Sequence, residues 1–139
     1  MPTTEERDRE LNSSHAGNPL TGPILTVVDD LIFLSKIQQT ARQVGVPVEP
    51  VEPSKAVERI TEFMVHSVIL DLNHRSGAAV ELARAIKTNP ATSHVQVMGF
   101  LSHVQSDLAA AARAAGCDFV LPRSAFSQQL PQLLLQLAG

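Results

Sequence analysis

Residues 24–30 have the sequence Ile-Leu-Thr-Val-Val-Asp-Asp, and residues 67–71 have the sequence Ser-Val-Ile-Leu-Asp. Each stretch is a short apolar run, rich in β-branched residues, that stops at acidic residues. Such a run is typical of a strand buried inside a parallel sheet. Between these strands and beyond them, apolar residues recur at helical spacing, so strands are expected to alternate with helices.

The same patterns extend over the rest of the chain. Strands are expected at residues 24–28, 46–51, 67–70, 95–101 and 119–121. Helices are expected at about residues 31–44, from an N-cap at Ser54 through Met64, at 80–89, at 104–115, and as one leucine- and glutamine-rich helix at the end. Because Pro47 and Pro50 cannot donate to a sheet ladder, the second strand belongs at an edge. Five alternating strands and helices predict an α/β fold with a doubly wound five-stranded parallel sheet and helices on both faces.

Composition restricts the function. We expect a flexible tail at residues 1–22 and one folded domain at residues 23–139. The formal net charge of -3 argues against nucleic acid or an anionic membrane as a partner. With a single cysteine and no signal peptide or membrane-spanning run, a cytoplasmic location is expected. No spacing suggests a nucleophile with its catalytic base, so no enzymatic activity is expected.

Three carboxylates follow strands that should lie near each other. Asp29 and Asp30 end the first strand, and Asp71 ends the third. Ligands of doubly wound sheets bind beyond the carboxyl ends of the strands, where strand order reverses. Hard oxygen ligands in an open site suit Mg²⁺. The alternative is that Asp29 and Asp30 only cap the following helix, whose dipole favours acids there.

In these features the chain resembles the receiver domains of response regulators in bacterial two-component signalling. The resemblance covers about residues 23–138 and rests on Val27-Val28-Asp29-Asp30, Val68-Ile69-Leu70-Asp71-Leu72 and Ala115-Gly116-Cys117-Asp118, in that order. It implies a receiver-like domain with the flavodoxin-like strand order 2-1-3-4-5. It also implies a phosphorelay role, with a histidine kinase or another signalling protein as partner.

The resemblance assigns roles to individual residues. It implies that Asp71 is the phosphoacceptor, that Asp29 and Asp30 are the Mg²⁺ acids, and that Asn73 offers its backbone carbonyl to the metal. Together with Asp71 these residues form the expected Mg²⁺ site.

Two positions depart from the family pattern. Counting from Asp71 places Leu101 where the family has a Ser or Thr hydroxyl, and Ser102 is a substitute only if a bulge or shifted register turns it. The same count places Arg123 where the family has Lys, although a shift by one residue would put Pro122 there and remove the cation. A planar guanidinium does not reproduce a compact ammonium.

These departures leave two functional readings. The chain is an atypical single-domain response regulator, with Mg²⁺-dependent phosphorylation at Asp71, or a pseudo-receiver that binds partners without being phosphorylated. A remote alternative is a cobalamin-binding-like domain, because residues 71–77 contain Asp, His and Gly, but His74 lies one residue too late for that signature.

The last predicted helix suggests self-association. It carries five leucines and only glutamine at its polar positions, and Leu135 is the leucine most expected to be exposed. A homodimer through the fourth and fifth predicted helices is therefore a further hypothesis.

Overall fold

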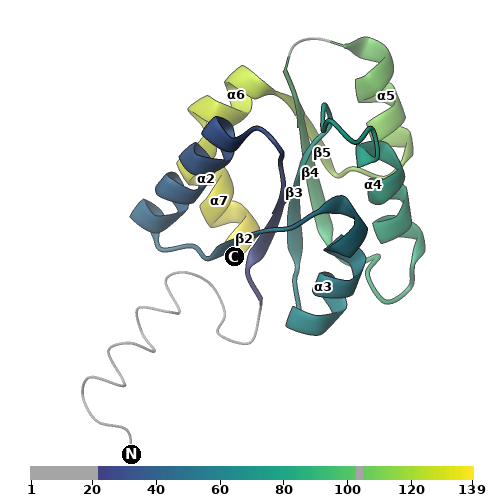
Figure 1. Ribbon diagram of the computed structural model, residues 1–139, viewed down its shortest axis with the longest axis horizontal. Coiled ribbons are helices and arrows are strands. Elements are labelled where there is room, and N and C mark those ends of the chain that lie inside the picture. Colours follow the sequence, from purple (N-terminus) through teal and green to yellow (C-terminus); the bar gives the residue numbers. More distant parts are fainter. Residues whose placement is uncertain (1–21, 103–104) are drawn as a thin grey trace, which may run out of the picture.

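The computed structural model describes residues 22–102 and 105–139. The tail predicted for residues 1–22 lies outside the described residues, apart from Gly22. The five strands are β1 (Ile24–Val27), β2 (Val48–Pro50), β3 (Ser67–Asp71), β4 (Gln96–Leu101) and β5 (Phe119–Pro122). They form one sheet in the order β2-β1-β3-β4-β5, and every pairing is parallel (Figure 1). The predicted flavodoxin-like order is confirmed.

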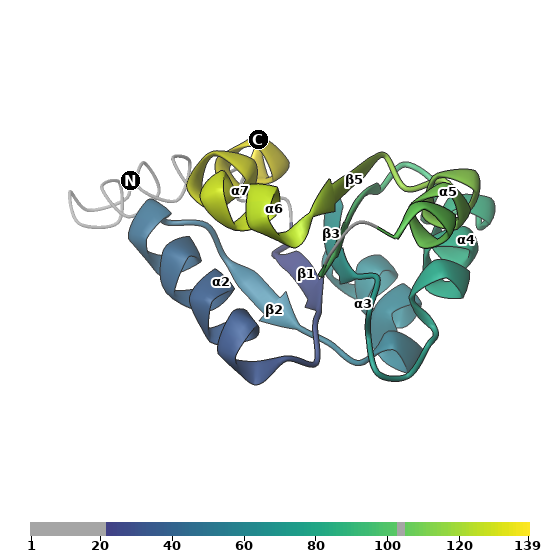
Figure 2. The same ribbon diagram turned by 90° about the horizontal axis from the view of Figure 1, so that it is seen from above.

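Helices cover both faces of this sheet. They are α2 (Leu31–Val44), the 3-10 turn η1 (Pro53–Lys55), α3 (Ala56–Phe63), α4 (Ala79–Thr88), α5 (Ser106–Ala114), α6 (Arg123–Gln128) and α7 (Leu130–Ala138). Seen from above, α2, α6 and α7 lie on one face, while α3, α4 and α5 lie on the other (Figure 2). The predicted doubly wound architecture is therefore confirmed.

Each face of the sheet has its own apolar cluster. Strand side chains alternate between the two faces, so Leu70 packs on the side of α3 and α4, whereas Ile69 packs with Phe100 on the side of α2 and α7. In α7, Leu130, Leu133, Leu134 and Leu137 are buried while Leu135 is 45% exposed, as predicted. Burial of four leucines anchors α7 to the sheet.

The first helix ends where the sequence predicts. Gly45 caps the carboxyl end of α2 with a left-handed φ of 74°, a conformation that glycine adopts without the steric cost of a Cβ atom.

Two local predictions are wrong. Ser54 does not cap α3, because residues 53–55 form a 3-10 turn and the helix begins only at Ala56, without a side-chain cap. The predicted single last helix is divided into α6 and α7. Pro131 stands in the first turn of α7, where a missing N–H is tolerated, but inside a continuous helix its ring would meet the carbonyl of Ser127.

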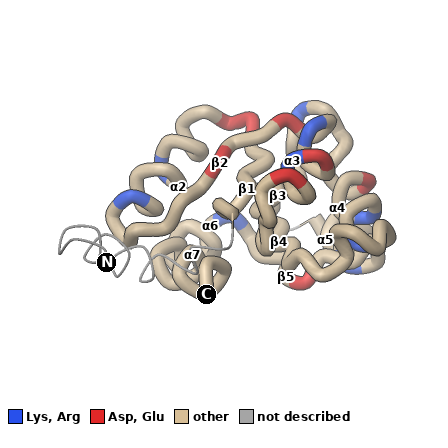
Figure 3. The backbone as a smooth tube through the Cα atoms, turned by 90° about the horizontal axis from the view of Figure 1, so that it is seen from below, with Lys and Arg blue, Asp and Glu red and all other residues tan. Residues whose placement is uncertain are grey.

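Charged residues are distributed over several elements. Lys and Arg positions of the described chain lie on α2, η1, α3, the loop after β3, α4, α5 and α6 rather than on one face (Figure 3). Within residues 22–102 and 105–139, no helix combines the length and the apolar character that crossing a membrane requires.

Candidate functional site

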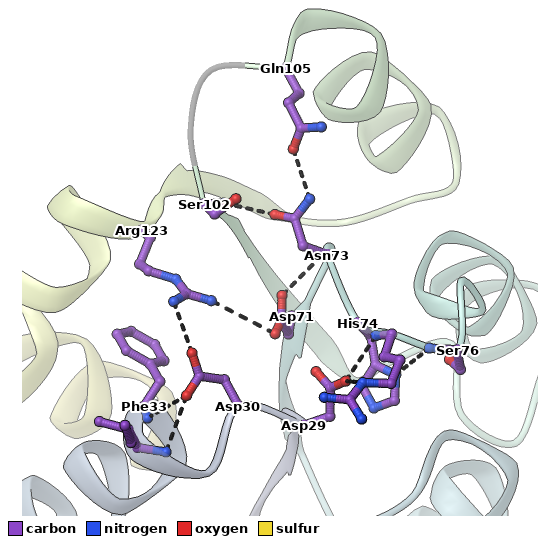
Figure 4. A network of polar contacts seen from close by, with 12 residues as sticks. Asp29, Asp30, Phe33, Asp71, Asn73, His74, Ser76, Ser102, Gln105 and Arg123 are labelled. Carbon is purple, nitrogen blue, oxygen red and sulfur yellow. Dashed lines mark hydrogen bonds and ion pairs between the residues drawn. The ribbon is translucent and has the colours of Figure 1, made fainter.

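The three predicted acids meet at the carboxyl edge of the sheet. β1 and β3 are adjacent and parallel, so the residues after Val27 and at the end of β3 come together (Figure 4). Arg123, the first residue of α6, extends its guanidinium toward two of these carboxylates. The site is thus built from residues far apart in the sequence.

Asp71 is the buried member of the site, with 2% of its side chain exposed. Its Oδ1 accepts a hydrogen bond of 2.9 Å from the amide of Asn73, and its Oδ2 lies 3.9 Å from Nη2 of Arg123. Burial raises the pKa of the Asp71 carboxyl, and the Asn73 amide and the Arg123 charge offset only part of that effect. Burial therefore opposes ionisation of Asp71.

Asp30 has two roles in the structure. Its Oδ1 accepts hydrogen bonds of 3.1 Å from the amides of Ile32 and Phe33, which caps α2. Its Oδ2 accepts a hydrogen bond of 3.2 Å from Nη1 of Arg123. The amide of Phe33, together with Arg123, lowers the pKa of the Asp30 carboxyl despite partial desolvation. Asp30 therefore caps α2, but it does not only cap the helix, because its other oxygen faces the site.

Asp29 points toward the loop after β3. Its Oδ2 accepts a hydrogen bond of 3.0 Å from the backbone amide of Arg75 and lies 3.4 Å from the Nε of the same residue. The Arg75 side chain is 90% exposed, so the ion pair is a surface contact and contributes little stability. The structural contribution of Asp29 is mainly the bond to the loop backbone.

Two aromatic rings hold the Arg123 guanidinium in place. Its central carbon lies 4.6 Å from the ring centre of Phe33 and 5.6 Å from that of Phe100, distances typical of cation–π contacts. Pro122 pairs with Leu101 at the end of the sheet, so β5 ends just before Arg123. In this register the cation is present at the site. The aromatic platform was not anticipated from the sequence, because its rings come from α2 and β4.

The side chain of Asn73 connects two loops. Its Nδ2 donates a hydrogen bond of 2.7 Å to Oε1 of Gln105, and its Oδ1 accepts one of 2.7 Å from the backbone amide of Ser102 (Figure 4). The sequence analysis assigned only the backbone carbonyl of Asn73, so this connection and Gln105 were missed. No signal in the sequence pairs residues 32 positions apart in this way.

The structure separates the roles of Leu101 and Ser102. Leu101 is 4% exposed and packs in the cluster beneath α3, α4 and α5, so it is a core residue. Ser102 is exposed at the end of β4 and reaches the network through its backbone amide. His74 accepts a hydrogen bond at Nδ1 from the Ser76 amide, a local loop contact that adds nothing to the cobalamin alternative.

The oxygen atoms at the site are of the kind that a hard divalent cation prefers, but they do not surround a single position. Carboxylate and carbonyl oxygens are the ligands that Mg²⁺ prefers. Among the described residues, no three or more His, Cys, Asp or Glu side chains form a group that could hold a metal ion. The carboxylates instead accept hydrogen bonds from backbone amides and pair with arginine side chains.

Comparisons with known proteins agree with this fold. No protein-family model matches the chain, and no curated protein matches it. Solved structures do. A response regulator from Hahella chejuensis has a TM-score of 0.72 at 20% identity and matches over 82% of this chain and 92% of its own. The chemotaxis response regulator CheY4 of Vibrio cholerae has a TM-score of 0.71 at 15% identity, over 84% and 98%.

A third structure, the Mn²⁺-bound form of the response regulator Rcp1, has a TM-score of 0.65 at 18% identity, over 83% of this chain and 90% of its own. At these identities the likeness establishes the fold. The predicted resemblance to receiver domains is confirmed at that level.

Proposed function

We propose that this chain, which has the receiver fold, is a non-enzymatic signalling module of the two-component type that works through contacts with other proteins. In this proposal it is a pseudo-receiver, in which Asp71 does not operate a conventional phosphorylation switch. One observation carries the proposal. Asp71 is buried and held by Arg123 and Asn73, while the position at the end of β4 is a core leucine, Leu101.

The absence of a hydroxyl at position 101 matters because of how a switch works. A ligand shifts a conformational equilibrium only by its differential affinity for the two states. When β4 moves, a phosphoryl group on Asp71 gains no hydrogen bond from the side chain at position 101, because leucine has no polar side-chain atom. We therefore expect Asp71 to be coupled weakly to α5.

Surface features support protein contacts as the output. A groove of about 240 Å³ runs between α5 and β5 and is lined by Ala109 and Arg113 on one side and Val120 and Leu121 on the other. The exposed Leu135 of α7 adds an apolar side chain to the surface. A histidine kinase, another signalling protein or a second copy of the chain is the partner that we propose for these surfaces.

The second candidate is a phosphorylated, atypical response regulator. The meeting of Asp29, Asp30 and Asp71 at one edge of the sheet favours it. Asp30, Asp71 and the backbone carbonyl of Asn73, with Asp29 nearby, are the groups that would hold a divalent cation. A divalent cation there, which we expect to be Mg²⁺, would neutralise carboxylate and phosphoryl charge. Rcp1, one of the structures with a similar fold, is a Mn²⁺-bound form.

Beryllium fluoride, a mimic of the acyl phosphate, distinguishes the two candidates. Amide chemical shifts of the protein would be recorded with Mg²⁺ before and after its addition, with Asp71→Asn as the control that cannot form the adduct. We expect changes confined to the loops after β1 and β3, or none. Large changes across residues 106–114 that vanish in Asp71→Asn would overturn the pseudo-receiver and restore a phosphorylation switch.

A further inference from the structure

In each of two site carboxylates, one oxygen accepts hydrogen bonds from backbone amides and the other does not. Oδ1 of Asp30 accepts the two capping amides of α2, and Oδ1 of Asp71 accepts the amide of Asn73. The second oxygen of each carboxylate faces the site. Of the oxygens of these two carboxylates, the Oδ2 atoms are the ones that a cation can reach without competing with a backbone amide.

Both of these oxygens already face the guanidinium of Arg123. Nη1 lies 3.2 Å from Oδ2 of Asp30, and Nη2 lies 3.9 Å from Oδ2 of Asp71. The planar, forked guanidinium spans the two carboxylates, which a point-like ammonium cannot do in the same way. A divalent cation on the same oxygens would stand next to a fixed positive charge, and like charges in a partly buried site repel strongly.

The aromatic platform holds the guanidinium against these oxygens. Phe33 follows the Asp30 cap by three residues, and Phe100 is the register partner of Asp71 in β4. Phe33 therefore lies on the helix that Asp30 caps, and Phe100 lies on the strand that pairs with the one ending in Asp71. Contacts with α2 and β4 hold the Arg123 guanidinium in position, so its positive charge faces the two carboxylates without a bound ion.

One hydrogen-bond donor of Arg123 lacks an acceptor among the described residues. Nε of Arg123 is buried and has no hydrogen-bond partner in the described part of the chain. A buried N–H donor without a partner destabilises the arrangement that contains it. In solvent Nε is hydrated, so a cation that displaces the side chain from the bridge also restores a hydrogen-bond partner to this donor.

We propose that Arg123 is a built-in competitor of divalent metal. Its guanidinium and the cation exclude each other at Oδ2 of Asp30 and Asp71, and metal binds only when the arginine leaves its aromatic platform. The inference rests on the second candidate function, in which Asp30 and Asp71 are among the groups that would hold a cation. It goes further in making one residue of α6 the determinant of metal affinity.

The test is a titration with MnCl2 and MgCl2, followed by calorimetry and by the proton relaxation of water around Mn²⁺. Arg123→Gln removes the charge and keeps a side chain of similar reach. Arg42→Gln, an exposed position in the last turn of α2, removes the same charge away from the site. Arg123→Lys keeps the charge but loses the planar fork and its stacking.

We expect Arg123→Gln to bind Mn²⁺ at least about tenfold more tightly than the wild type, which corresponds to about 1.4 kcal/mol. Arg42→Gln should bind like the wild type, and Arg123→Lys should lie between the wild type and Arg123→Gln. Adding Asp71→Asn to Arg123→Gln should abolish the gain. In the wild type, saturating Mg²⁺ should shift the amides of Phe33 and Phe100 as the guanidinium leaves their rings.

Equal or weaker metal binding by Arg123→Gln overturns the inference, as does complete absence of binding in that variant. A gain that survives Asp71→Asn overturns it too, because the metal would then sit elsewhere. If Arg123→Gln does not fold, Arg123→Lys decides by the same criteria. None of these results changes the beryllium fluoride experiment, which reports on α5 in the wild type, so failure of the inference and failure of the proposed function are distinguishable.

Discussion

Replacing Asn73 by alanine should disconnect the loop that carries Asp71 from the start of α5. The side chain makes two hydrogen bonds of 2.7 Å, one to Gln105 and one from the amide of Ser102. A typical hydrogen bond adds about 0.5–1.5 kcal/mol net to stability, so losing both should cost about 1–3 kcal/mol. Met64 is the one described non-glycine residue with a positive φ, so alanine at position 73 adds no backbone strain.

A double-mutant cycle isolates the part of this effect that belongs to the bond with Gln105. Gln105→Ala alone should cost about 0.5–1.5 kcal/mol, and Asn73→Ala should cost less in the Gln105→Ala background than in the wild type, by about the energy of the shared hydrogen bond. Urea unfolding of the four proteins gives the coupling energy. Hydrogen exchange of the Ser102 amide provides a second measurement, and it should accelerate about 2–10-fold in Asn73→Ala but much less in Gln105→Ala.

Strict additivity of the two substitutions would refute this reasoning, because it would mean that the side chains do not interact in solution. Unchanged exchange of the Ser102 amide in Asn73→Ala would refute the second bond. Either result would also remove the most direct polar route from the Asp71 loop to α5.

Three further predictions concern single residues. Because burial raises the pKa of Asp71 above its ordinary value of 3.8, the stability that this carboxyl contributes is present below that value and is lost as pH rises through the folded pKa. Asp71→Asn should therefore gain stability over the wild type between about pH 4 and pH 7 in urea unfolding, and a pH-independent difference would contradict this. Leu134→Ala, at 0% exposure, should cost about 2–5 kcal/mol, whereas Leu135→Ala, at 45%, should cost under about 1 kcal/mol by the same assay; equal costs would contradict the packing of α7. If the chain forms a homodimer through α5 and α7, Leu135→Glu should shift it toward monomer in sedimentation velocity at several concentrations, and a wild type that is monomeric throughout would end that hypothesis.

Periodicity and strand-end chemistry were sufficient for the architecture. The apolar runs before Asp29 and Asp71 predicted buried parallel strands, and Pro47 and Pro50 predicted the edge position of β2. These predictions hold because they depend on properties that act locally, namely side-chain alternation, β-branching and the missing N–H of proline. The same local chemistry could have predicted the break before α7 from Pro131.

The arrangement of the site was harder to predict from the sequence. The sequence indicated that Arg123 stands near the expected position of a cation, but it left the register of Pro122 and Arg123 open. Pairing of Leu101 with Pro122 in the sheet places Arg123 just beyond β5, from where its side chain reaches Asp30 and Asp71. Register is a property of two strands together, so no pattern within β5 alone could determine it.

By itself, then, the sequence determined the fold class, the strand order through the resemblance, and the set of acids that would meet at the carboxyl edge. Only the tertiary structure decided how those acids are compensated. Arg123 rests on Phe33 and Phe100 from two other elements, and Asn73 reaches Gln105 across 32 residues. The physical reason is that hydrogen-bond and cation–π energies fall off within a few ångströms, so they depend on distances that exist only after the sheet and helices have packed.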